Sequence, residues 1–113
     1  MVKNNQFVLY LLEMLQAFGQ VQAKPMFGGF GIYRDELIFA IVVDDALYIK
    51  ADEDSLELFN KEELPRFTYL KNGKACFMAY YQVPDEAVDD IDVLNYWAQI
   101  GCQAALRTRK TTT

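Results

Sequence analysis

The stretch KPMFGGFGIYRDELIFAIVVDDALYIKAD, residues Lys24–Asp52, most constrains how this chain can fold. Aromatic and β-branched residues favour strands, and they crowd three segments of the stretch. These segments are Phe27–Tyr33, Leu37–Val43 and Leu47–Ile49. The stretch therefore predicts a three-stranded antiparallel meander. Its two interruptions, Asp35-Glu36 and Asp44-Asp45, lack the glycine that a two-residue primed turn favours, so we expect each turn to be a residue or two longer.

The flanking segments predict three helices and a second hairpin. Apolar residues at three- and four-residue spacing indicate a helix from about Gln6 to Phe18, which Asn4 or Asn5 can cap and Gly19 ends. This helix is apolar beyond one stripe, so it is either covered in the core or forms a dimer contact. Between it and the meander, Val21–Pro25 is read as an extended lead-in, because proline disfavours helix in the residue before it.

The second half of the chain carries the strongest turn signal. Asn72-Gly73 joins Arg66–Lys71 to Lys74–Gln82 in a strongly aromatic hairpin, which is either a stacking platform for bases or part of the core of the sheet. A short helix precedes the hairpin, and a last helix follows it with a core-facing stripe that includes Trp97.

These elements predict an α+β domain. It is a two-layer structure in the order α-β-β-β-α-β-β-α, with an antiparallel sheet and helices mainly on one face. We expect one domain over residues 1–110 and a frayed tail over residues 111–113.

Composition excludes several function classes. The net charge is −5 and the pI is near 4.6, so we expect no direct nucleic-acid binding, which takes a basic surface. No apolar run approaches the ~18 residues that span a bilayer, and no signal peptide is recognisable, so we expect no membrane contact and a cytoplasmic location. Cys76 and Cys102 lie far apart and histidine is absent, so we expect buried thiols, no metal and no cofactor.

Two clusters have a structural and a functional interpretation. Gly28, Gly29 and Gly31 predict a bulge or a close backbone approach; alternatively they bind an anion or small ligand with Lys24 or Arg34 nearby. The acidic segment 52–54 is suited to the start of a helix, although paired carboxylates also serve acid–base chemistry or a hard metal. We favour the structural interpretation of both clusters.

Particular motifs in this order closely resemble the N-terminal domain of the TfoX (Sxy) competence-regulator family. The motifs are KPMFGGFGIY, FAIV, LYIKAD, FTYLKNGK, AYYQVPDEA and LNYWAQIGCQAA, and the resemblance covers about Tyr10 to Leu106. The family often has glycine after aspartate in the first hairpin, where this chain has Asp35-Glu36. The residues of these motifs, which we expect to be mainly structural, are Met26, Phe27, Gly28, Gly29, Gly31, Tyr48, Tyr80, Tyr81 and Trp97.

The resemblance implies a bacterial, non-enzymatic regulator with a secretion-chaperone-like fold. Better-known members activate DNA-uptake genes alongside the cyclic-AMP receptor protein and continue into a second, helical domain. We therefore expect a stand-alone or truncated member whose partner is another protein, either a transcription regulator or a second copy in a homodimer. Its candidate interaction surface comprises Lys24, Tyr33, Arg34, Lys50, Lys71 and Lys74. An enzyme is the least favoured hypothesis, because the sequence shows no pairing of catalytic groups.

Overall fold

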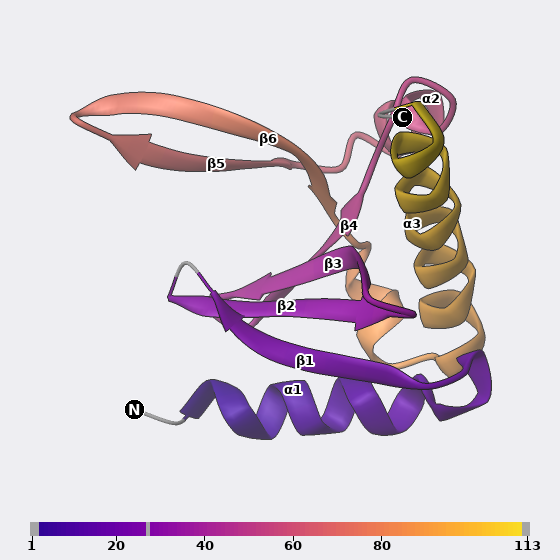
Figure 1. The fold of residues 1–113 in the computed structure, drawn as a ribbon. Coiled ribbons are helices and arrows are strands. Elements are labelled where there is room, and N and C mark those ends of the chain that lie inside the picture. Colours follow the sequence, from indigo (N-terminus) through magenta and orange to yellow (C-terminus); the bar gives the residue numbers. More distant parts are fainter. Residues whose placement is uncertain (1–2, 27, 112–113) are drawn as a thin grey trace.

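The computed structural model describes residues 3–26 and 28–111, and Figure 1 shows the α+β architecture predicted from the sequence. The helices of this part of the chain are α1 (Lys3–Met14), α2 (Leu56–Lys61) and α3 (Ile91–Thr111), with 3-10 turns η1 (Gln16–Phe18) and η2 (Asp85–Val88). The strands are β1 (Val21–Met26), β2 (Gly29–Arg34), β3 (Leu37–Val43), β4 (Ala46–Lys50), β5 (Arg66–Lys71) and β6 (Lys74–Gln82). Phe27 and residues 112–113 lie outside the described residues; Thr111, predicted to fray, is the last residue of α3.

All six strands form one antiparallel sheet in the order β1-β2-β3-β4-β6-β5. Strand β1 is an addition to the predicted order, because the segment that we expected to be a lead-in pairs with β2 from Val21↔Arg34 to Met26↔Gly29. It lies at an edge of the sheet, where Pro25 is tolerated although it lacks an N–H group. The predicted first strand accordingly begins at Gly29.

The two turns of the meander are shorter than expected. Asp35-Glu36 and Asp44-Asp45 each form a complete two-residue connection, and all four residues have positive φ, between 52° and 68°. Positive φ at both central residues is the geometry of a type I′ turn, which matches the twist of the strands that it joins. The prediction of longer turns was wrong because strand pairing imposes this geometry on acidic residues.

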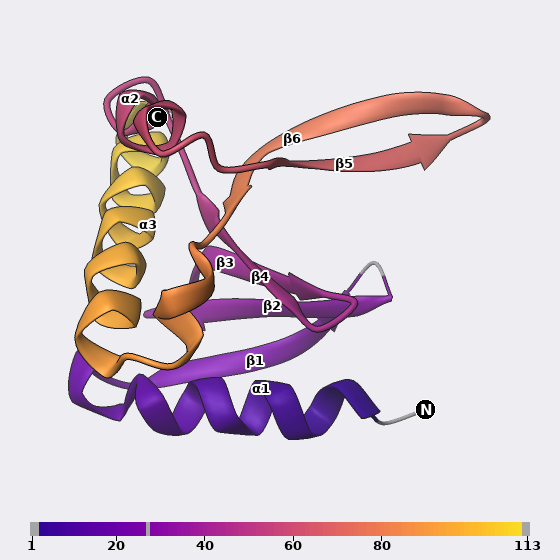
Figure 2. The same ribbon diagram turned by 180° about the vertical axis from the view of Figure 1, so that it is seen from behind.

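The helices cover one face of the sheet, as predicted. Figures 1 and 2 show α1 beside β1, and α3 packs against β3 and β4. All three helices contribute to one hydrophobic core with the sheet, including Leu11 of α1, Phe59 of α2 and Trp97 of α3. Burying each such side chain stabilises the fold by roughly 1.5–3 kcal/mol.

Strand β3, which is apolar throughout, is buried on both faces. Phe39 and Ala40 both join the core beneath the helices, whereas Ile41 joins a second cluster on the opposite face. Two consecutive residues can face the same way because the β2–β3 register shifts between Ile32 and Tyr33.

Helix α1 divides its apolar residues between the core and the surface. Val8, Leu11 and Leu15 are buried, whereas Leu9 is 64% exposed. The helix begins at Lys3, so the predicted asparagine cap lies inside it, and the chain turns away at Gly19, where φ is +128°. Core packing thus explains one stripe of the helix, and the dimer contact stays a prediction.

Candidate interaction surface

The face of the sheet opposite the helices, which we call the far face, carries an aromatic cluster of its own. Ile41, Phe67 and Tyr80 are buried here, and Tyr48 packs edge-on against Phe67 with ring centroids 5.0 Å apart. Strand alternation directs these side chains away from the helices. The aromatic cluster of the far face is therefore built from β3, β4, β5 and β6 together.

Four residues singled out in the sequence meet on the far face. The Lys24 ammonium lies 4.8 Å from the ring centroid of Tyr33, and the Lys50 ammonium lies 5.3 Å from that of Tyr80. Burial raises the pKa of Tyr80 to about 12, and the nearby Tyr33 adds to the shift. Burial also lowers the pKa of Lys50, while Asp52 opposes that change. The far face thus has two cations above aromatic rings, each contact worth about 0.5–1 kcal/mol where it is exposed.

The structure separates the remaining predicted surface residues from this group. Arg34 places its guanidinium 4.5 Å from the ring centroid of Phe18, at the end of the α1–η1 segment. It also contacts Cys102, although burial dominates there and raises the pKa of that thiol to about 11. Lys71 and Lys74 are paired beside the β5–β6 turn. Of the motif residues, Tyr81 and Trp97 lie in the core and contact Phe59, with 5.0 Å between ring centroids in each case.

Close packing accounts for two glycines of the glycine-rich stretch. A Cβ atom on Gly29 would lie 2.0 Å from the carbonyl oxygen of Val42. A Cβ atom on Gly31 would lie 2.6 Å from the sulfur of Met26, and Ile38 is almost as near. Gly28 has open space around it but a φ of +76°. The Gly29 contact is a close backbone approach, one of the two structural roles that we predicted for this stretch, whereas Gly31 is packed against side chains.

The distal part of the β5–β6 hairpin forms a projecting arm, which we define as residues 68–78. Strand β6 pairs with β4 only through Tyr80, Tyr81 and Gln82, so the preceding residues of β6 extend past the sheet with β5 (Figure 1). Apolar side chains on this arm stay exposed: Leu70 is 75% exposed and Phe77 is 59% exposed. Exposed apolar groups of this size, grouped together, are typical of interaction sites.

The sequence left two interpretations of this hairpin open, an exposed aromatic platform or part of the core of the sheet. In the structure each applies to a different part of the hairpin. Phe67 and Tyr80, near the base, belong to the core of the sheet, whereas Tyr69 and Phe77 lie exposed on the arm. Leu70 was absent from the predicted surface. A usable signal was present, because apolar residues stand at consecutive positions of the arm, Tyr69 and Leu70 in β5 and Phe77 and Met78 in β6. Consecutive residues of a strand point to opposite faces, so one packed face does not require this pattern.

A cavity lies where the arm meets the rest of the far face. It has a volume of about 430 Å³. Its lining residues are Val43, Asp44, Tyr48, Phe67, Thr68, Tyr69, Leu70 and Met78. The arm and the far face thus meet at this cavity, and together they form the candidate interaction surface of this domain.

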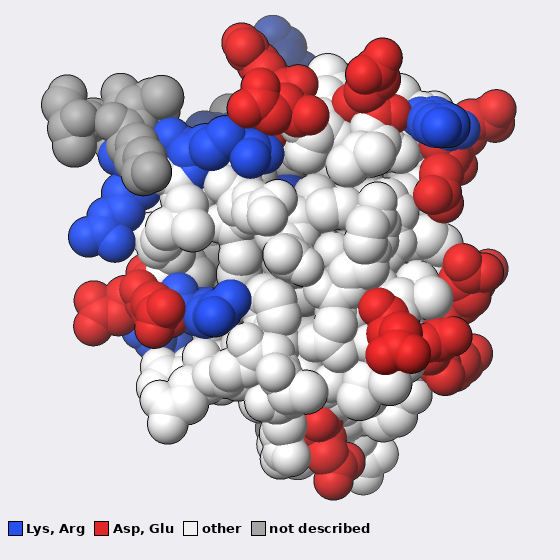
Figure 3. Space-filling model, turned by 90° about the vertical axis from the view of Figure 1, so that its right-hand side faces the viewer, with Lys and Arg blue, Asp and Glu red and all other residues white. Residues whose placement is uncertain are grey.

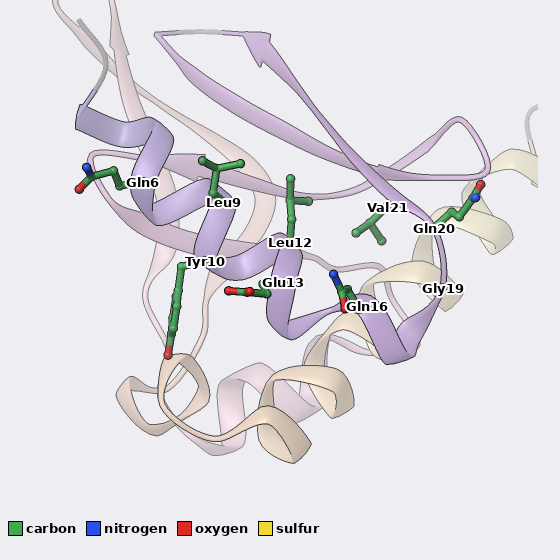
Figure 4. A pocket seen from close by; sticks show the side chains of 9 residues that line it. All are labelled: Gln6, Leu9, Tyr10, Leu12, Glu13, Gln16, Gly19, Gln20 and Val21. Atoms are coloured by element: carbon green, nitrogen blue, oxygen red, sulfur yellow. The ribbon is translucent and has the colours of Figure 1, made fainter.

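A second hollow, of about 920 Å³, lies between α1 and the start of β1. Figure 4 shows its lining side chains, among them Leu9 and Glu13 on α1, Gln16 on η1 and Val21 on β1. The Tyr10 hydroxyl donates a hydrogen bond to the carbonyl oxygen of Val88 and so ties α1 to η2. This hollow is shallow, and Leu9 is its most exposed apolar side chain.

The outer side of α3 forms a third surface of note. Residues 93–106 contain no charged residue, and Figure 3 shows a broad uncharged area on this side of the molecule with acidic groups at its rim. Tyr96 is 50% exposed and Leu106 is 47% exposed. Glutamines at 99 and 103 separate them, so this surface is less apolar than the arm.

The acidic segment before α2 is held by an arginine from α3. Arg107 donates from Nε to Asp52 Oδ2 at 2.6 Å and from Nη2 to Asp52 Oδ1 at 2.9 Å, and its Nε lies 3.2 Å from Asp54 Oδ2. The backbone N–H and the hydroxyl of Ser55 also donate to Asp52 Oδ1, both at 3.1 Å. The hydrogen bond from Arg107, followed by those from Ser55, lowers the pKa of Asp52 to about 2.

We expect Asp52→Asn to lower the free energy of unfolding by about 1 kcal/mol at pH 7, a value that allows for water screening because Arg107 is 38% exposed. The pKa of Asp52 is lower in the folded chain than in the unfolded chain. The contribution of Asp52 to the free energy of unfolding is therefore complete above about pH 4, and it is lost as the pH falls towards 2. Urea unfolding at pH 7 and at pH 2.5 measures both values.

Asp54→Asn is the matched control, because Asp54 makes one ionic contact and its side chain is 71% exposed. We expect it to change the free energy of unfolding by less than about 0.5 kcal/mol. An Asp52→Asn loss as large at pH 2.5 as at pH 7 would contradict the ionic origin of the effect.

Among residues 3–26 and 28–111, no group of three or more His, Cys, Asp or Glu side chains is placed to hold a metal ion. None of the described helices is both long enough and apolar enough to cross a membrane. Cys76 and Cys102 are free thiols, each half-buried.

The arrangement of sheet, helices and arm can be compared with known proteins. The sequence model of the TfoX N-terminal domain matches residues 13–105. The chain belongs to the TfoX N-terminal domain family. The match begins within α1 and ends within α3, so the TfoX N-terminal domain includes the sheet, the far face and the arm.

Two curated relatives share this domain. Protein Sxy of Escherichia coli is 28% identical over 99 residues, which are 88% of this chain and 47% of Sxy. DNA transformation protein TfoX1 of Aliivibrio fischeri is 24% identical over 73 residues, which are 65% of this chain and 35% of TfoX1. The chain thus spans about half the length of these relatives or less. Neither relative carries the name of an enzyme.

Proposed function

We propose that this TfoX N-terminal domain is a non-enzymatic, cytoplasmic protein-interaction module that supports transcriptional regulation of DNA-uptake genes. Family membership over residues 13–105 gives the regulatory context. The observation that carries the interaction role is the projecting arm, which keeps Leu70 and Phe77 exposed although the fold has a complete core without them. Such side chains lower the solubility of a free domain and gain stability when a partner covers them.

The acidic composition supports a role through a protein partner. The chain has 16 acidic and 11 basic residues, and this excess of negative charge disfavours binding to the phosphate backbone of DNA. A regulator of this kind acts at promoters through contact with a DNA-bound protein. By the family resemblance, the cyclic-AMP receptor protein is the partner to test first.

The experiment that tests this function is deletion of the gene, followed by measurement of all transcripts under conditions that induce DNA uptake. We expect transcripts of DNA-uptake genes to fall and to recover when the intact gene is restored from a plasmid. Unchanged transcripts together with normal uptake of DNA would overturn the proposal.

A further inference from the structure

We propose that β5 is the docking edge for an extended, acidic segment of a partner protein, which pairs with β5 as a seventh strand of the sheet. The proposal rests on the proposed interaction function, and it identifies the surface and the chemistry of the partner. Edge strands bind peptides in this way because their outer N–H and C=O groups are unpaired within the sheet.

The two edges of the sheet differ in how they are protected. Edge strand β1 contains Pro25, which cannot donate a hydrogen bond, and α1 packs against this strand. Edge strand β5 has no proline, and its central residues Phe67–Leu70 are uncharged. Proline and charged side chains are the usual means of preventing strand addition, so β5 is the edge open to it.

The arm offers a different chemistry on each of its faces. Leu70 and Phe77 lie on one face, because Thr68 pairs with Phe77 and alternate residues of a strand point the same way. Tyr69 lies on the other face, which it shares with Lys71 and Lys74. A strand added to β5 would continue both faces. Its best match alternates apolar side chains beside Leu70 with acidic side chains beside Lys71.

The charge of the hairpin selects an acidic partner. Residues 66–83 contain Arg66, Lys71 and Lys74 and no acidic residue, so this segment has a charge of +3. With that segment removed from a chain of net charge −5, the remainder has a charge of −8. The arm is therefore a basic, apolar projection from an acidic domain, and electrostatic attraction would draw an acidic segment to it.

The same charges disfavour a second copy of this chain at β5. An antiparallel pair of β5 strands centred between Thr68 and Tyr69 would place Arg66 of each copy opposite Lys71 of the other. In other registers the two strands would still contribute only positive charges. Like charges on facing strands destabilise pairing, so the occupant is a different protein.

A ¹⁵N NMR titration of the intact chain tests the proposal with three capped heptapeptides. The first alternates glutamate with valine, and the others replace each glutamate by glutamine or by lysine. We expect the glutamate peptide to shift the amide signals of β5 and to slow their hydrogen exchange. We expect the glutamine peptide to bind more weakly and the lysine peptide to show no saturable binding.

Charge reversal at the tip provides the matched variants. Lys71→Glu with Lys74→Glu is expected to weaken binding of the glutamate peptide about tenfold, because two exposed attractions become repulsions. Lys61→Glu, on the exposed part of α2, makes the same kind of change away from the arm and is expected to leave binding unchanged. The ¹⁵N spectrum of each variant shows whether the fold is retained.

Several results would overturn the proposal. They are peptide-induced shifts at β1 instead of β5, equal binding of all three peptides, and concentration-dependent β5 protection without peptide, which would indicate a second copy. Saturable binding of a single-stranded DNA 12-mer at the arm, with no binding of the glutamate peptide, would do the same. None of these outcomes affects the transcript measurement, so the docking edge and the regulatory function can fail separately.

Discussion

Replacing Gly29 by alanine is expected to lower the free energy of unfolding by about 3 kcal/mol. The new Cβ atom would lie 2.0 Å from the carbonyl oxygen of Val42 and 3.3 Å from the Cα atom of Val43, and both atoms belong to the backbone. Relief therefore requires the β2 backbone to move away from β3, at the start of their pairing. Overpacking of this kind costs about 1–3 kcal/mol and occasionally more, a large share of the ~5–15 kcal/mol typical of a domain.

Gly28→Ala separates the steric clash from backbone strain. Gly28 has a φ of +76° and open space around the position of a Cβ atom, so only strain of about 1–2 kcal/mol is expected. Thermal and urea unfolding of the two variants measure the difference. A Gly29→Ala variant as stable as the parent chain would show that β2 and β3 do not approach as closely as the structure has them.

Replacing Phe59 by alanine is expected to cost about 3–5 kcal/mol. This side chain is fully buried, stacks on Tyr81 and contacts Trp97, so its removal leaves a cavity between α2, α3 and β6. We expect a lower urea midpoint and a changed near-ultraviolet circular dichroism signal, since Trp97 loses a packed neighbour. A chain that is only marginally stable would unfold outright.

Leu58→Ala is the control for Phe59→Ala, because Leu58 precedes it in α2 and is 38% exposed. We expect this variant to lose less than about 1 kcal/mol, since much of its side chain is already in water. An equal loss of unfolding free energy in the two variants would contradict this prediction. It would indicate that alanine destabilises helix α2 at either position and that the aromatic cluster adds nothing.

The sequence predicts the fold class well because its buried strands carry strong signals. The segment 37–43 is apolar throughout, and Asn72-Gly73 favours the tight turn that the structure shows, with φ of 54° and 79°. Strand β1 carries no such signal: Gln22, Lys24 and Pro25 read as a polar connection, because an edge strand beside a helix needs few apolar residues. The turn at Asp35-Glu36 was missed because its conformation is imposed by the strands on residues that seldom adopt it.

The candidate surface is predictable only in part, because side-chain grouping depends on strand order. Charge is what marks Lys24 and Lys50 in the sequence, and only the six-stranded order brings them to one face with Tyr33 and Tyr80. Arg34 follows Tyr33 directly and so faces the helices. The exposure of Leu70 was not predicted, because an apolar residue in a predicted strand is normally assigned to the core.

Helix α3 completes the core although it is the last element of the described chain. It supplies Leu94, Trp97 and Ala98 to the core, and it packs on β3 and β4. About forty residues separate the end of β4 from the start of α3, which is roughly 2–8 s of synthesis at the usual rate of translation. The nascent meander therefore leaves the ribosome with the part of its apolar face that α3 covers still exposed. Slower translation or an early stop upstream of α3 would therefore yield an aggregation-prone sheet. The synthesis of α3 sets the time at which the nascent chain can bury this apolar surface.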